Sequence, residues 1–171
     1  MESIFGAQLP RIGSTITAEP NVAIKTEIEF ACRTVKLTKA LVDRAVQTIA
    51  GDYGWKQGEI SITIVDDPTI HRLNREYLEH DYPTDVISFD TTERKGFLEG
   101  EVIASGDTAN RIASENGWNA SHELLLYLVH GMLHIVGLDD TTATQANRMR
   151  REERHYMEHL VGDVTVCQED R

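Results

Sequence analysis

Cysteines, prolines and long apolar runs are all scarce in this sequence. Its 171 residues include two cysteines and four prolines. Cys32 and Cys167 form no Cys-x-x-Cys pair, so we expect two reduced thiols rather than a disulfide scaffold or a thiolate metal site. No apolar run approaches the roughly 18 residues of a membrane helix, and the first residues do not resemble a secretory signal. We therefore expect a cytoplasmic protein without membrane contact.

Basic residues are also in the minority. Lysine and arginine number 17 against 28 acidic residues, which gives a net charge of −11. A body this acidic does not hold nucleic acid by bulk attraction, although a local basic groove stays open. Four arginines near the C-terminus alternate with Glu152 and Glu153, a pattern typical of a solvated helix face rather than an RNA site. They are Arg148, Arg150, Arg151 and Arg154.

The hydropathy pattern indicates an α+β fold in one domain. Apolar residues alternate with polar ones over residues 22–30 and again over residues 60–64, which predicts half-buried strands. Two shorter strands are predicted around residues 86–89 and 102–103, with a loop or hairpin over residues 92–100. We expect residues 1–20 to form a loose N-terminal arm and residues 21–171 to form the single domain.

Helical spacing of apolar residues separates and follows these strands. A stripe through Leu37, Ala40, Leu41, Ala45 and Ile49 predicts the first helix. Asp67-Pro68 predicts a helix start, with Asp67 as the cap. A short helix is expected over residues 107–116, and residues 121–136 form the most apolar helix, which Gly137 should end. Thr142 and Gln145 fit a capping box for a final helix.

Two histidines on the most apolar helix point to a metal site. His130 and His134 are four residues apart, so both imidazoles project from one helical face and can reach one ion. Gly137 then breaks the helix and allows the chain to return a third ligand, for which Asp140 is better placed than Asp139. Two alternatives remain: the histidines could be hydrogen-bonded core residues, and Asp140 could cap the final helix.

Gly131 bears on the class of chemistry. The metalloprotease motif His-Glu-x-x-His places its general base directly after the first histidine. Here that position is glycine, which costs roughly 1 kcal/mol against alanine inside a helix. Close packing, or a close approach to the site, would explain it.

At these residues the chain resembles the YbeY family of metal-dependent endoribonucleases. His130-Gly-Met-Leu-His-Ile-Val-Gly-Leu-Asp-Asp140 is similar to the family's His-Gly-x-Leu-His-Leu-x-Gly-Tyr-Asp-His. Leu73-Asn-Arg-Glu-Tyr77, followed by Pro83-Thr-Asp-Val-Ile-Ser-Phe89, resembles a second signature. Gly100-Glu-Val-Ile-Ala-Ser105 resembles a third, Gly-Asp-Ile-x-Ile-Ser. The resemblance covers about residues 22–160.

The resemblance implies a small mixed four-stranded sheet packed with helices, including a zincin-like metal helix. It implies one Zn²⁺ per chain, held by His130, His134 and Asp140 with a position left open for water. It also implies work on the 3′ end of small-subunit ribosomal RNA, association with the small ribosomal subunit, and a part in ribosome quality control.

The chain departs from the family pattern at two positions. Asp140 stands where the family usually has histidine, and a donor set of two histidines and a carboxylate also suits other first-row divalent metals. Leu78 stands where many members carry an arginine thought to serve RNA cleavage. Arg75 or His80 is the candidate to supply that positive charge.

These observations predict metal-assisted hydrolysis of an RNA phosphodiester. Asp85 is a candidate catalytic base, although it could equally cap the turn it follows. One rival function is a non-catalytic ribosome assembly factor with a structural metal, and a more distant one is a zinc metallopeptidase. A fourth protein ligand, for which His71 and His122 are candidates, would favour the structural metal, whereas an open coordination position would favour an enzyme.

Overall fold

The computed structural model describes residues 23–79 and 81–162. The predicted arm at residues 1–20, His80 and Cys167 lie outside the described residues. The elements are β1 (Ala23–Phe30), α1 (Lys39–Asp52), β2 (Gln57–Val65), α2 (Asp67–Leu78), β3 (Val86–Asp90), β4 (Leu98–Ser105), α3 (Gly106–Asn116), α4 (Ala120–Ile135) and α5 (Ala143–Val161). The predicted α+β class is confirmed.

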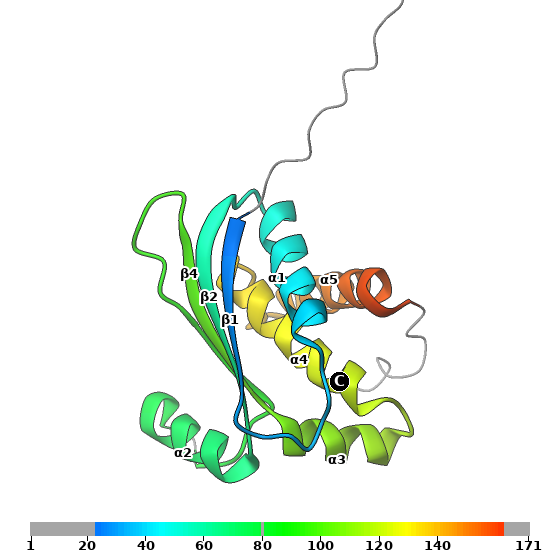
Figure 1. Cartoon of the computed structure of the whole chain (residues 1–171). Coiled ribbons are helices and arrows are strands. Elements are labelled where there is room, and N and C mark those ends of the chain that lie inside the picture. Colours follow the sequence, from blue (N-terminus) through cyan, green and yellow to red (C-terminus); the bar gives the residue numbers. More distant parts are fainter. Residues whose placement is uncertain (1–22, 80, 163–171) are drawn as a thin grey trace, which may run out of the picture.

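The four strands form one mixed sheet in the order β1-β2-β4-β3 (Figure 1). β1, β2 and β4 run parallel, and β3 pairs antiparallel with β4, so that Val86 lies opposite Ala104 and Asp90 opposite Gly100. The short connection between β3 and β4 is the predicted hairpin. β3 thus ends the sheet on one side, and Asp85 precedes its first residue.

Helices cover the sheet on both faces. α1, α4 and α5 lie on one face and α2 lies on the other (Figure 1). The alternation of side chains along β4 explains the two cores: Val102 belongs to the large core under α4, whereas Ile103 packs with Ile70 of α2 in a smaller one. A site on α4 and a residue on α2 are therefore separated by the sheet.

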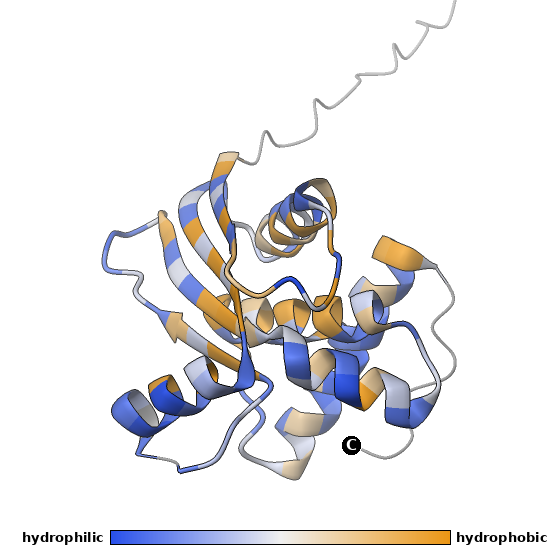
Figure 2. Ribbon diagram, turned by 60° about the horizontal axis from the view of Figure 1, so that its bottom comes forward, coloured by the Kyte–Doolittle hydropathy of each residue, from blue (hydrophilic) through white to orange (hydrophobic). Residues whose placement is uncertain are grey.

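α4 is the central helix, as its composition predicts (Figure 2). It contacts α1, α3, α5, β3 and β4, and its apolar side chains are buried on nearly every side. Gly131 lies where α4 crosses β4. A Cβ atom built on Gly131 would lie 2.7 Å from a methyl carbon of Val102. Close packing against the sheet, one of the two explanations for a glycine here, is thus the structural reason for it.

Two predicted helix starts need correction. α1 begins at Lys39 after the cap Thr38, so Leu37 precedes the helix, and Ala40 is exposed. The buried stripe of α1 is instead Val42, Ala45, Val46, Ile49 and Ala50. α2 is capped by Asp66, whose carboxylate accepts from the Thr69 N–H at 2.9 Å. Asp67 is the first helical residue, and its carboxylate accepts hydrogen bonds from Ser105 and Thr108 instead.

Candidate metal centre and active site

His130 and His134 lie side by side near the C-terminal end of α4. Their rings meet edge to face with centroids 4.6 Å apart, and their Nε2 atoms are 3.0 Å from each other. Each side chain is about a quarter exposed, so one edge of the pair is open to solvent. The four-residue spacing thus places both imidazoles together, as expected from one turn of helix.

The second nitrogen of each ring has its own hydrogen-bond acceptor. Nδ1 of His130 donates to Oε1 of Glu153 on α5 at 2.6 Å. Nδ1 of His134 donates to the backbone oxygen of Leu138 at 3.0 Å. Because a carboxylate and a carbonyl only accept, both Nδ1 atoms carry hydrogen. In the neutral rings, both Nε2 atoms therefore present lone pairs toward the same point.

Asp140 completes a group of three possible ligands. Its Oδ2 is 3.9 Å from Nε2 of His130, and its Oδ1 is 3.9 Å from Nε2 of His134. Gly137, with a φ of +101°, turns the chain after α4 and brings Asp140 back. The cap of α5 is Thr142, in a capping box with Gln145, so Asp140 is not the N-cap. Asp139 accepts the Asp140 and Thr141 N–H groups within the turn.

The chemistry of these donors fits a divalent first-row metal. One ligand atom from each of the three residues lies within 4.8 Å of the other two. Two lone pairs 3.0 Å apart repel unless a proton or a cation lies between them. Ligand nitrogens about 2.0–2.1 Å from a tetrahedral zinc lie roughly 3.3 Å apart, so only a small movement of the rings is needed. The three residues could therefore hold a metal ion.

The charge of Glu153 acts directly on His130. Burial lowers the pKa of the His130 imidazole, but the hydrogen bond and charge of Glu153 act against it with two further carboxylates, and the pKa of His130 is raised above its usual value. Asp140 and Asp85 add to the rise. A ring held by a carboxylate in this way is also a more basic ligand for a metal.

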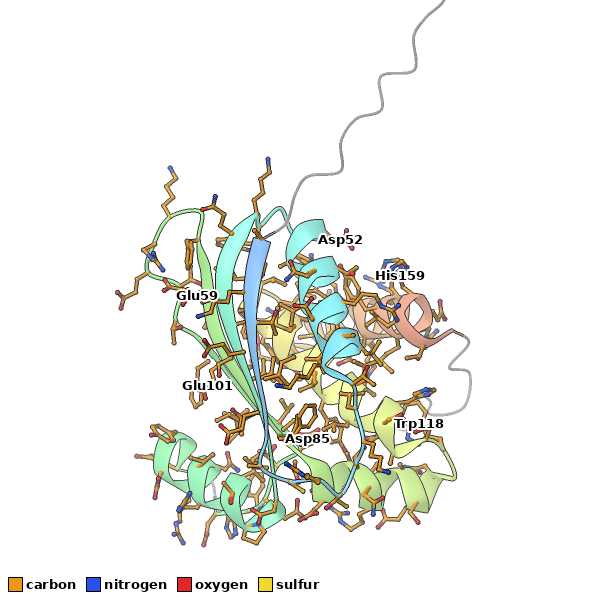
Figure 3. The ribbon with its side chains drawn as sticks, viewed as in Figure 1. Asp52, Glu59, Asp85, Glu101, Trp118 and His159 are labelled. Carbon is orange, nitrogen blue, oxygen red and sulfur yellow. The ribbon has the colours of Figure 1, made fainter. Side chains whose placement is uncertain are left out.

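Two cavities meet at His130. A cavity of about 330 Å³ lies toward α5, and one of about 480 Å³ lies toward β3. Asp85 (labelled in Figure 3) lines both of them together with His130. Its Oδ1 also accepts from the Val86 N–H at 2.9 Å and from the Thr84 hydroxyl at 3.0 Å. Asp85 thus stabilises the turn before β3 and borders the histidine pair as well.

The remaining histidine candidates lie elsewhere. Nε2 of His71 is 2.9 Å from Oδ1 of Asp81, and His122 packs edge to face against Trp118. Within residues 23–79 and 81–162, the group at His130 holds three potential ligands and neither of these histidines. Three protein ligands leave a tetrahedral ion with an open position.

Arg75 is not brought to this pair of cavities. It lies on α2, across the sheet from α4 (Figure 1), and its side chain is 61% exposed. Its nearest carboxylate is that of Asp81, with 4.0 Å between nitrogen and oxygen. Arg75 lines neither cavity, and His80 is not described, so the catalytic role of both stays a prediction.

Comparison with known proteins supports the resemblance seen in the motifs. The sequence model of the family described as "Endoribonuclease YbeY" matches residues 23–169. The chain belongs to the endoribonuclease YbeY family. Its relatives include the endoribonuclease YbeY of Rhodopirellula baltica, 44% identical over 138 residues, which are 80% of this chain and 68% of the relative. The YbeY of Elusimicrobium minutum is 38% identical, with 77% of this chain and 92% of the relative covered.

A solved structure supports the fold. The solution structure of the Thermotoga maritima protein TM1509 matches with a TM-score of 0.55, covering 80% of this chain and 89% of that one at 21% identity. In the described part of this YbeY-family chain, no helix is both long and apolar enough to cross a membrane.

The sequence prediction for this YbeY-family site missed Glu153 and Arg150. Both were assigned to a solvated helix face, yet both line the cavity toward α5, and Glu153 binds His130. A signal was present for Glu153: it falls between Met149 and Tyr156 in the buried stripe of α5 at a spacing of four and three residues. A charged residue within an apolar stripe indicates a buried partner.

Proposed function

We propose that this chain is a metal-dependent endoribonuclease that hydrolyses single-stranded RNA. We further propose that residues 21–171 form the hydrolase domain and that its ion is Zn²⁺, bound by His130, His134 and Asp140. The observation that carries the proposal is the convergence of two Nε2 lone pairs and one carboxylate beside two cavities. Membership of a family described as endoribonucleases supplies the substrate class.

Each residue near the ion has a distinct part. When bound, zinc supplies an activated water and polarises a phosphoryl oxygen. Glu153 and the Leu138 carbonyl fix the two imidazoles with Nε2 facing the ion. Asp85, which borders both cavities, accepts the proton of the attacking water. The carboxylate of Asp85 is held for this by the Val86 N–H and the Thr84 hydroxyl.

The packing of Gly131 argues against a peptidase. The general base of a His-Glu-x-x-His protease would stand at this position. Its Cβ atom alone would approach Val102 to 2.7 Å, so α4 could not carry a glutamate there without moving away from β4. In this proposal, the site therefore has metal ligands of the zincin type but no carboxylate at the position where the peptidase motif places its base.

The natural substrate in this proposal is the 3′ end of small-subunit ribosomal RNA. The protein would meet it in the cytoplasm, in association with the small ribosomal subunit, and would also take part in ribosome quality control. The motif resemblance of residues 73–89 and 130–140 supports this choice, since the family it points to acts on that RNA. The substrate is single-stranded in this proposal because an unpaired strand can be splayed out, so that one phosphate reaches the cavities beside His130.

A comparison of substrates tests the proposal. Purified protein is analysed for metal, stripped with a chelator, reloaded with zinc, and offered both ribosomal RNA fragments and a peptide library. We expect chelator-sensitive RNA cleavage that zinc restores, with the His134→Ala variant inactive. Chelator-sensitive peptide cleavage without RNA cleavage would establish the peptidase instead. Inertness toward both substrates, with metal bound and normal ribosome association, would establish the non-catalytic factor.

A further inference from the structure

One face of α5 forms a wall of the cavity beside His130. Four of its residues line that cavity at helical spacing, namely Ala146, Met149, Arg150 and Glu153. Because Glu153 lies 2.6 Å from Nδ1 of His130, this face is fixed against the histidine pair. Arg150 is one turn before Glu153, and residues three apart on a helix are neighbours. Arg150 is thereby placed on the wall of the same cavity, beside Glu153.

The charges of this cavity show what Arg150 contributes. Three carboxylates line it, those of Asp85, Asp140 and Glu153. With neutral histidines and one divalent ion, the cavity would keep one net negative charge and would repel an RNA phosphate. The guanidinium of Arg150 offsets that remaining charge. Of the residues that the structure describes, Arg150 is the one lysine or arginine that lines either of the two cavities.

Arg150 is not held in an ion pair by the residues that the structure describes. Its contact is a hydrogen bond from Nη1 to the amide oxygen of Asn147 at 3.1 Å, and among the described residues no carboxylate lies within ion-pair distance of it. Arg94 and Arg111, by contrast, are paired with Glu99 and Glu115. A planar guanidinium without a carboxylate partner is well suited to bind a phosphate through two parallel hydrogen bonds.

We propose that Arg150 binds the scissile phosphate of the RNA. This inference rests on the proposed function and adds the cation that neither Arg75 nor Leu78 supplies at the two cavities. Arg150 then holds the phosphate from the α5 side, while Asp85 faces it from the start of β3.

Arg150→Met tests the proposal, since methionine keeps much of the apolar stem and removes the charge. We expect kcat/KM for an RNA oligonucleotide to fall roughly 100-fold, as for the loss of one preorganised donor, with metal content unchanged. Arg150→Lys should recover part of the loss, because it restores the charge without the bidentate geometry. The matched control is Arg151→Met on the same helix. Arg151 is exposed and lines neither cavity, so kcat/KM should stay near the wild-type value.

A second readout does not depend on cleavage. Affinity for a single-stranded DNA oligonucleotide, which carries the same phosphates but is not RNA, is measured against salt concentration with zinc present. Losing one phosphate contact makes the salt slope shallower by about 0.7. We expect the shallower salt slope for Arg150→Met and the wild-type slope for Arg151→Met. Equal effects of the two variants, no effect of Arg150→Met, or loss of metal from Arg150→Met would each overturn the inference. If the salt slope differs between wild-type protein and Arg150→Met but the wild-type protein cleaves no RNA, the proposed function fails and the phosphate contact stands.

Discussion

Glu153 on α5 accepts a hydrogen bond from Nδ1 of His130 on α4, across 23 residues of sequence and a distance of 2.6 Å. This bond joins α4, which carries His130 and His134, to α5, which carries Arg150. It also sets the tautomer of His130 and the direction of its Nε2 lone pair.

Glu153→Gln should weaken metal binding. The glutamine amide oxygen can still accept the hydrogen bond from Nδ1 of His130. The substitution removes the negative charge that makes this imidazole a stronger metal ligand. Loss of such a supporting group typically costs 10- to 100-fold in metal affinity. A zinc titration against a competing chelator measures the change. Glu158→Gln is the control, because Glu158 is exposed on the same helix. Equal affinity in both variants would show that Glu153 does not support a ligand.

Asp140 and Thr142 should separate metal binding from helix capping. Thr142→Ala removes the cap of α5 and should cost about 1 kcal/mol of stability while leaving metal affinity unchanged. Asp140→Asn should lower metal affinity and leave stability without metal nearly unchanged. It removes the charge of a candidate ligand that is not the cap of α5. Asp140→His should keep or raise zinc affinity. Thermal unfolding and metal titration of all three variants give the two readouts, and Asp140→Asn with wild-type affinity would rule out ligation.

Chelation should destabilise the wild-type protein and leave His134→Ala unaffected. An ion that binds the folded state alone stabilises it by about 2.7 kcal/mol when its concentration is 100 times its Kd. A chelator should therefore lower the Tm of the wild-type protein, which has the site, and not that of His134→Ala, which lacks it. Melting curves with zinc and with chelator are compared for the two proteins. A metal-dependent Tm that persists in His134→Ala would place the ion elsewhere in the chain.

Gly131→Ala should destabilise the fold even though alanine favours helices. The new Cβ atom would lie 2.7 Å from Val102, and overpacking of this kind costs about 1–3 kcal/mol, against a gain of up to about 1 kcal/mol from helix propensity. Combining it with Val102→Ala relieves the clash, so the two changes together should cost less than their sum. Chemical denaturation of the single and double variants measures this coupling. Strict additivity would contradict the packing explanation.

Local patterns predicted much of this molecule because the relevant partners are close in sequence. The spacing of His130 and His134, the break at Gly137 and the capping box at Thr142 all operate within a turn or two of chain. The placement of Asp140 beside the two histidines follows from the same short segment.

Features that depend on how elements pack against one another were not predictable in this way. Periodicity identified the apolar side of α2, but not the face of the sheet that α2 covers, and that choice separates Arg75 from α4. The contact of Glu153 with His130 depends on the crossing of α4 and α5. Asp66, rather than Asp67, caps α2, and the carboxylate of Asp67 instead accepts from Ser105 of β4 and Thr108 of α3.

The three candidate ligands lie within residues 130–140, whereas α5 contributes two of the groups that act on them from residues 150–153. Local opening of α5 would therefore withdraw the carboxylate of Glu153 and the guanidinium of Arg150 in one event, while His130 and His134 stayed in place on α4. Ion retention and substrate affinity would then share one opening free energy, which amide hydrogen exchange along α5 reports. In this proposal, the docking of α5 would couple ion retention to substrate binding.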